Sequence, residues 1–163
     1  MNPDRQIVGV ATIFNQRAYG GTLWEPAEFG RWLAMEMAIP VRLDHGAILD
    51  SSGVILDIGR AGPFAIIERP VFGLLALLEL DEGDWQDALL EDVRQHLESP
   101  YLKPYGLSLG AHRLRGEVCL PYELSLTQQP GFPDALVLGV GTQAQAVWSL
   151  LTEPILNGQA VQP

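Results

Sequence analysis

The chain has 163 residues, of which 47% are hydrophobic and 18% are charged, a composition typical of a globular domain and not of a disordered chain. Ten basic and twenty acidic residues give a formal net charge of −10. This charge argues against binding to nucleic acid, because the protein would repel phosphate groups. We expect one domain over residues 1–163, with a core at about 6–152 and a flexible tail at 153–163.

The hydrophobic segments are too short to span a membrane, so we expect no membrane association. The N-terminal segment MNPDRQIVGVATIF lacks the apolar stretch of a secretory signal. Cys119 is the single cysteine, which excludes an internal disulfide and indicates the reducing cytoplasm. Cys119 lies in an apolar segment, and we expect it to be a small core residue.

Short apolar segments separated by Gly and Pro predict a chain composed mainly of strands, with a few helices. In chain order we expect a strand at 6–14, a helix at 25–37, strands at 39–45, 53–59, 63–70 and 71–80, a helix at 81–99, strands at 105–114, 117–127 and 136–140, and a helix at 142–151. Asp84 is expected to cap the second helix. This succession predicts an α+β fold with a barrel-like antiparallel core flanked by about three helices.

Residues 106–110 read GLSLG, which matches the G-x-S-x-G pattern of the nucleophile elbow in α/β-hydrolases. That elbow requires a turn from a strand into a helix, but Gly116 and Pro121 follow too soon for a sustained helix. The elbow also requires a later histidine. The only histidine after Ser108 is His112, and four residues along a strand separate the two by about 13 Å. The context therefore argues against an elbow.

A serine nucleophile can also take its base from elsewhere in the chain, since only the geometry matters. His96 lies among charged residues of the second predicted helix, where we expect a solvated surface position. His112 shares a strand with Ser108 and is expected at the surface or at a barrel end. His45 ends the segment PVRLDH, and strand ends often carry catalytic groups. The alternative for His45 is a loop histidine hydrogen-bonded to Asp44.

A serine nucleophile and its base also need a third group that orients the base, and an expected hairpin supplies a candidate. A two-residue turn at 115–116 would place Ser108 opposite Glu123, and opposed side chains share one face of a sheet. An imidazole from another strand could then bridge the serine and the carboxylate. Pro121 weakens this register, because proline cannot donate to a strand ladder and often marks a bulge. The alternative for Glu123 is a solvated strand carboxylate.

Taken in order, these segments resemble the prohead maturation proteases of tailed bacteriophages, which are related to the herpesvirus assemblins. The resemblance covers about residues 6–140. The matching features are an alternating first strand, then PVRLDHG with its histidine, SGVILDIG, FGLLALLEL, a helix, GLSLGAHRL, and finally YELSLTQQPGFPDALV, which is similar to the family's Glu-x-Ser-x-x-x-x-Pro segment.

This resemblance implies a serine endopeptidase in which His45 is the base and Ser108 the nucleophile. Glu123 is our candidate for the orienting third residue, and Asp44 is its alternative. The implied substrates are the major capsid protein and the scaffold protein, cut inside the assembling prohead in the bacterial cytoplasm, together with the protease itself. The implied core is a β-barrel surrounded by helices, and a homo-oligomer is compatible with it. The turn at 128–131 is our candidate for holding the oxyanion.

Two other functions remain open from the sequence. The first is an inactive relative that acts as a capsid-assembly or scaffold-binding module, in which Ser108 and His45 would lie apart. The second is a hydrolase of small esters with a closed pocket. A metal or other cofactor is not expected, because the three histidines lack ligand spacing and have no cysteine partner.

Overall fold

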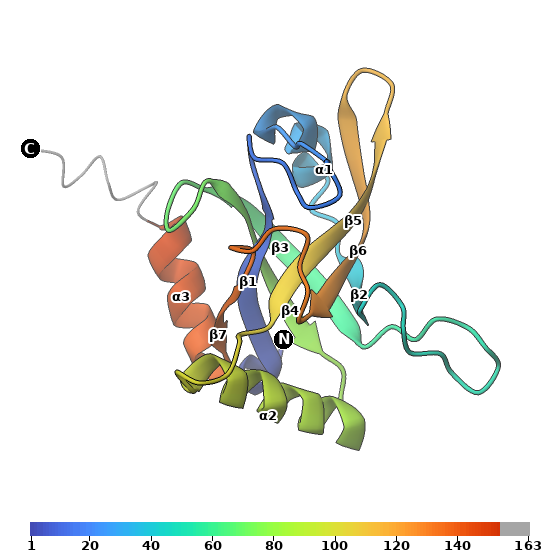
Figure 1. The fold of residues 1–163 in the computed structure, drawn as a ribbon, viewed down its shortest axis with the longest axis vertical. Helices are drawn as coiled ribbons and strands as arrows, with labels where there is room; N and C mark the ends of the chain where they lie inside the picture. Colours follow the sequence, from blue (N-terminus) through green and yellow to red (C-terminus); the bar gives the residue numbers. More distant parts are fainter. Residues whose placement is uncertain (154–163) are drawn as a thin grey trace, which may run out of the picture.

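The computed structural model describes residues 1–153, so the predicted tail at 154–163 lies outside the described residues. The strands are β1 (Gln6–Ile13), β2 (Ile39–Leu43), β3 (Gly59–Ile67), β4 (Gly73–Leu80), β5 (Gly106–Leu114), β6 (Val118–Thr127) and β7 (Val137–Val140). The helices are α1 (Gly30–Ala34), α2 (Asp84–Glu98) and α3 (Thr142–Thr152), with short 3-10 helices η1 (Pro3–Arg5) and η2 (Pro26–Phe29). Figure 1 shows their arrangement.

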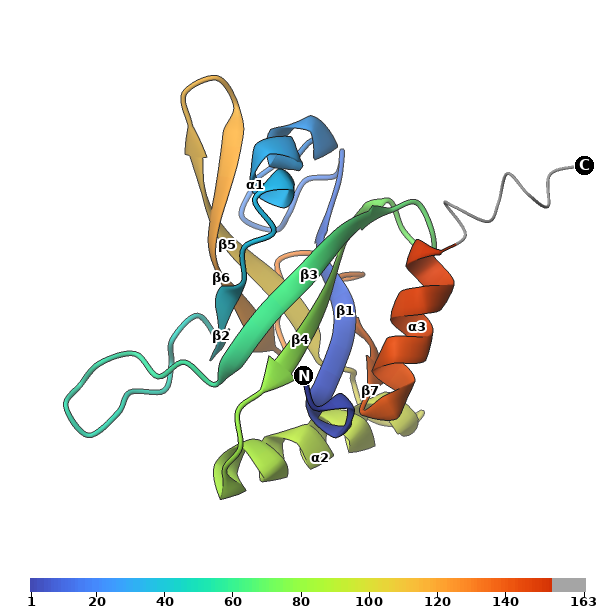
Figure 2. The same cartoon turned by 180° about the vertical axis from the view of Figure 1, so that it is seen from behind.

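The strands form one sheet in the order β5-β6-β2-β3-β4-β1-β7, which curls into a half-barrel (Figures 1 and 2). The two edges of this sheet meet at one short bridge. There the N–H of Leu107 donates to Ala135 O at 2.8 Å, and the N–H of Val137 donates to Tyr105 O at 2.9 Å. The α+β, barrel-like fold with three α-helices is thus confirmed for the described residues. The sheet is mixed, however, because β2 and β6 pair in parallel.

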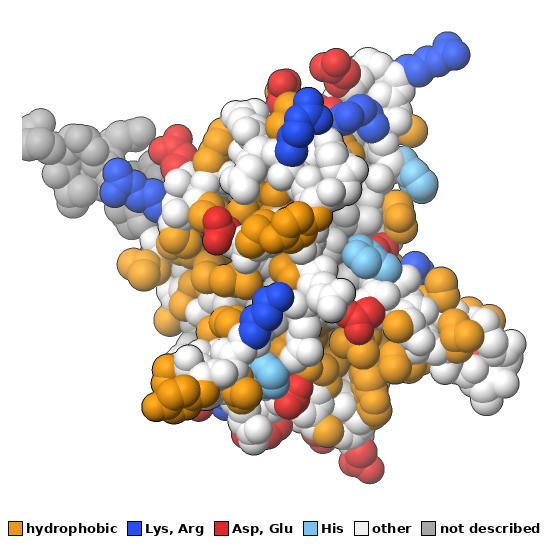
Figure 3. Space-filling view, viewed as in Figure 1, with side chains coloured by type: hydrophobic (Ala, Val, Ile, Leu, Met, Phe, Trp, Pro, Cys, Tyr) orange, Lys and Arg blue, Asp and Glu red, His pale blue; other side chains and the backbone are white. Residues whose placement is uncertain are grey.

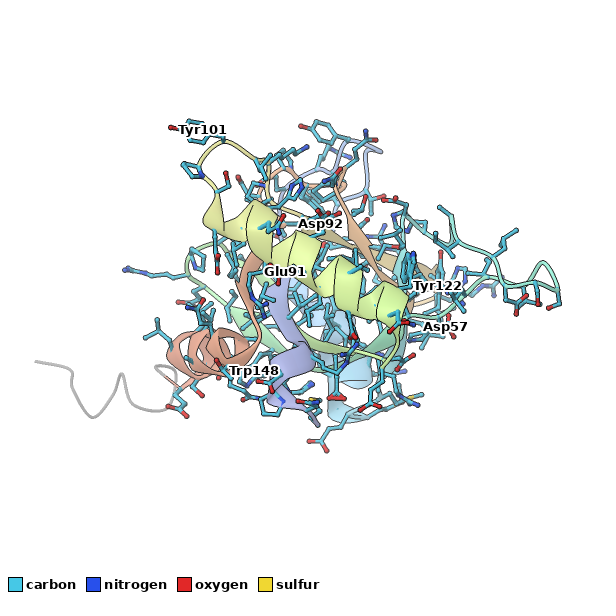
Figure 4. The ribbon with its side chains drawn as sticks, turned by 90° about the horizontal axis from the view of Figure 1, so that it is seen from below. Asp57, Glu91, Asp92, Tyr101, Tyr122 and Trp148 are labelled. Atoms are coloured by element: carbon cyan, nitrogen blue, oxygen red, sulfur yellow. The ribbon has the colours of Figure 1, made fainter. Side chains whose placement is uncertain are left out.

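The helices cover the sheet at different places. Helix α3 packs on β1 and β7, and the all-buried pattern of β1 follows because both of its faces are covered. Helix α2 crosses the end of the sheet, with Glu91 and Asp92 on it (Figure 4). Helix α1 lies beside β6 (Figure 1). No helix within residues 1–153 combines the length and apolar character needed to cross a bilayer.

Four local predictions differ from the structure. The predicted helix 25–37 is shorter, because it divides into η2 and α1 and ends at Ala34. The predicted strand 53–59 is wrong, because 53–58 belong to the loop before β3 and only Gly59 lies in a strand. The predicted strand 63–70 begins earlier, because β3 runs from Gly59 through Gly62 and Pro63, and a register shift between Ala61 and Phe64 accommodates these two residues. Asp84 is the first residue of α2 and not its cap, since Gly83 occupies the cap position without a side-chain bond.

The core fills the space between the curled sheet and the helices. Its largest side chains with almost no exposure come from β1, β3, β4, β5 and β6 together with Phe29 and Ile58. Cys119 is completely buried, as predicted, and its thiol is free. The polar side chains buried in the same region include Glu123 and Ser125 of β6. Buried polar groups require partners, so these two residues lead directly to the candidate site.

Candidate active site

The β5–β6 hairpin carries two members of the predicted site, but in a different register from the predicted one. Ser108 lies opposite Ser125, and Gly110 lies opposite Glu123. The prediction that Ser108 faces Glu123 is therefore wrong by two residues. The turn is one residue longer than expected and includes Glu117 at φ 57°, and a bulge beside Pro121 adds one more residue to β6. Glu123 still shares a face with Ser108, because the two shifts together preserve the alternation of side chains.

The parallel pairing of β2 with β6 brings His45 to the hairpin. Leu43 pairs with Leu126, and the N–H of Asp44 donates to Leu126 O at 3.2 Å. The chain then turns sharply, with φ of 45° at Asp44, 57° at His45 and 93° at Gly46. Positive φ is uncommon for residues other than glycine, and such conformations cluster at functional sites. This turn directs the His45 side chain back over β6.

His45 lies between the other two side chains. Its Nδ1 is 2.6 Å from Glu123 Oε1, and its Nε2 is 3.1 Å from Ser108 Oγ. Glu123 is buried, with 3% of its side chain exposed, whereas 52% of the His45 side chain is exposed. Figure 3 shows histidine side chains at the surface of the face seen in Figure 1. The structure therefore joins all three sequence-predicted residues in one series of hydrogen bonds from a buried carboxylate to the hydroxyl of the half-buried Ser108.

Ser125 is a residue of this site that the sequence analysis missed. Its hydroxyl donates to Glu123 Oε2 at 2.9 Å and accepts from the backbone N–H of His45 at 2.7 Å. The signal was present in the segment YELSL, because residues two apart on a strand point to the same side. Without the position of His45, however, nothing distinguished Ser125 from an ordinary strand serine.

Both glycines of GLSLG are explained by close contacts. A Cβ on Gly110 would lie 2.5 Å from Glu123 Oε1, so only glycine leaves room for the carboxylate. A Cβ on Gly106 would lie 2.6 Å from Ala135 O, so glycine there lets the bridge between the sheet edges form. The match to the elbow pattern is thus coincidental. Ser108 lies within a strand that continues to Leu114, as the sequence context predicted.

The electrostatics favour one arrangement of protons. The hydrogen bond that His45 donates to Glu123 raises the pKa of His45 above its ordinary value, partial burial lowers it, and the charges of Glu123 and Asp44 raise it further. The Glu123 carboxylate accepts a hydrogen bond from the N–H at Nδ1 of His45, which leaves the Nε2 lone pair facing Ser108. Asp44 acts on His45 through its charge, while Glu123 is the carboxylate in hydrogen-bonding contact.

A pocket of about 320 Å³ opens beside His45 and Ser108. One wall is formed by β5 from Ser108 to Ala111, and the other by the end of β1 and the loop that follows it. β5 is the last strand of the sheet and pairs with β6 on one side only. On its other side, the bridge between Gly106 and Leu136 ends near Leu107, and no further strand within residues 1–153 pairs with β5. This wall of the pocket is therefore an unpaired strand edge. Gly131 also lines the pocket, and a Cβ built there would lie 4.0 Å from Ser108 Oγ. The turn at 128–131 thus lies beside the hydroxyl.

The other two histidines lie outside this chain of hydrogen bonds. The prediction of a solvated His96 is wrong: only 17% of its side chain is exposed, and its Nδ1 lies 2.8 Å from Lys103 O. His112 is at the surface, as predicted, and stacks on Tyr122 with ring centroids 4.6 Å apart. Within residues 1–153, there is no group of three or more His, Cys, Asp or Glu side chains that could hold a metal ion.

Comparison with known proteins adds no relative: no protein-family model matches the chain, and no curated protein matches it.

Proposed function

We propose that this protein is a serine endopeptidase in which Ser108 is the nucleophile, His45 the general base and Glu123 the residue that orients His45. The observation that carries the proposal is the hydrogen-bonded chain from Glu123 through His45 to Ser108, with distances of 2.6 and 3.1 Å. A nucleophile, a base within hydrogen-bonding reach and a third group that orients the base are the requirements for this chemistry, whatever their order in the sequence.

The mechanism follows from these contacts. Neutral His45 takes the Ser108 proton on Nε2 while the hydroxyl oxygen attacks a peptide carbonyl. The imidazolium that forms is stabilised by the buried carboxylate of Glu123 and then donates its proton to the leaving amine. Backbone N–H groups of the turn at 128–131 are our candidates for the oxyanion donors, because Gly131 lies beside Ser108 Oγ. Water attacking the acyl-enzyme by the same route completes hydrolysis.

The surroundings of Ser108 favour a peptide as substrate. The pocket is bordered by the outer edge of β5, whose outward-facing backbone groups beyond Leu107 have no strand partner within residues 1–153. An extended peptide can add to such an edge as a further strand, which a small ester cannot do. An inactive binding module would not need the 3.1 Å contact between His45 and Ser108.

The proposed substrates rest on the resemblance to prohead maturation proteases. We propose that the enzyme cleaves extensions of the major capsid protein and of the scaffold protein in the bacterial cytoplasm, inside the assembling prohead, and that it also cleaves itself. The direct test is to incubate the purified protein with both candidate substrates and follow cleavage by mass spectrometry. Trimming by the wild type and none by Ser108→Ala supports the proposal. Equal trimming by both proteins, or by neither, contradicts it.

A further inference from the structure

We infer that Ser125 is a positioning residue that holds both His45 and Glu123 in place for the reaction. This inference rests on the proposed function. Ser125 is completely buried, so it does not contact a substrate in the pocket. Its hydroxyl nevertheless binds both partners of Ser108: it donates to Glu123 Oε2 at 2.9 Å and accepts from the N–H of His45 at 2.7 Å.

The bond to Glu123 sets the orientation of the carboxylate. Glu123 has two oxygens, and each has one partner: Oε2 accepts from Ser125, while Oε1 meets His45 Nδ1 at 2.6 Å. With Oε2 held by a neighbour on the same strand, the carboxylate plane cannot rotate away without losing a bond to a charged group. Such bonds are stronger than those between neutral groups. Ser125 thereby aims Oε1 at the imidazole.

The bond to His45 sets the backbone from which the imidazole projects. His45 and Asp44 both have positive φ, at 57° and 45°, a region that non-glycine residues avoid. The N–H of His45 donates to Ser125 and not to a backbone carbonyl. One buried hydroxyl therefore fixes both ends of the His45–Glu123 contact, namely the backbone position of the base and the direction of the carboxylate.

Replacing Ser125 with alanine removes both bonds and leaves Glu123 Oε2 and the His45 N–H without their partner. We expect the rate of Ser108 modification by a fluorophosphonate, a small reagent that reacts with activated serines, to fall about 10- to 100-fold, the range found when groups supporting a reactive centre are removed. With a peptide substrate, kcat should fall by the same factor while KM stays unchanged, because Ser125 does not contact the substrate.

A readout independent of catalysis is the NMR signal of the His45 Nδ1 proton. A proton held in the 2.6 Å contact with Glu123 should give a slowly exchanging low-field signal in the wild type, and Ser125→Ala should lose it. Cys119→Ala is the matched control, because it also removes one buried heavy atom from β6 but lies outside the site. It should keep both the signal and the labelling rate.

Ser125→Cys is the second variant, because its thiol is a weak donor and acceptor of similar size. It should fall between the wild type and Ser125→Ala. Thermal unfolding checks that each variant is folded. A folded Ser125→Ala or Ser125→Cys that keeps both the proton signal and the wild-type labelling rate overturns the inference. Absence of labelling in the wild type refutes the proposed function instead, and the proton signal still tests the positioning by Ser125.

Discussion

Gly110→Ala tests the steric requirement behind the second glycine of GLSLG. The added Cβ would lie 2.5 Å from Glu123 Oε1 and 2.8 Å from its Cγ, whereas non-bonded atoms prefer about 3.5 Å. The carboxylate must therefore move by about 1 Å, away from the position at which Oε1 meets His45. A misplacement of this size in an active site costs about 100-fold in rate. Overpacking of this buried site should also destabilise the fold by about 1–3 kcal/mol.

The assay is the second-order rate of Ser108 labelling by a fluorophosphonate, measured together with thermal unfolding. Gly139→Ala is the matched control, because its Cβ would lie 3.1 Å from Val8 Cγ1 and 3.2 Å from Val147 Cγ2, in the packing under α3 and outside the candidate site. We expect Gly139→Ala to lower stability without slowing the labelling. A folded Gly110→Ala that is labelled as fast as the wild type would refute the steric argument.

Four further predictions concern charge, pH and burial. Glu123→Gln should slow the labelling of Ser108, but less completely than loss of His45. The amide of glutamine can still contact Nδ1 of His45, whereas the negative charge of the carboxylate is lost. An unchanged rate would point to Asp44 as the orienting group. The labelling rate should fall as the pH drops through the pKa of His45, with a midpoint above the ordinary value of about 6.5, and a midpoint below 6.5 contradicts the bond to Glu123. Because folding raises the pKa of His45, protonation of His45 stabilises the fold. This stabilisation is complete at a pH below the pKa of His45 in the unfolded chain and is lost as the pH rises through its pKa in the folded protein. Urea unfolding at a series of pH values measures the resulting change in the free energy of unfolding. Burial raises the pKa of Cys119 to about 12, so iodoacetamide at pH 8 should modify this thiol only after the protein unfolds. Mass spectrometry measures the modification, and rapid modification of the native protein would contradict the burial of Cys119.

Much of the fold could be predicted from local patterns. The strands ending at Leu80, Leu114 and Thr127 agree with the predicted segments, because alternation and the Gly and Pro residues between them are local signals. The start of β3 was predicted too late because Pro63 normally interrupts a strand, whereas here a register shift keeps it within β3. The parallel pairing of β2 with β6 was not predictable, since it joins residues about 83 positions apart.

The candidate site, like the fold, could be predicted from local sequence signals only in part. His45 and Ser108 could be named because one ends a strand and the other lies in a distinctive glycine-bounded segment. The contact of Glu123 with His45 was reached through a wrong register, which depended on the length of the turn near Gly116. Ser125 was missed because its role is defined by the backbone of His45, which arrives from a distant part of the chain.

The most direct test of the central claim is to label the protein with a fluorophosphonate and locate the modified residue by peptide mapping. If Ser108 is a nucleophile activated by His45, the label should fall on Ser108 at close to one equivalent. His45→Ala should remain folded and should not be labelled on the same timescale. Absence of the label from Ser108 in the wild type, or equal labelling of the folded His45→Ala variant, would contradict the proposed mechanism.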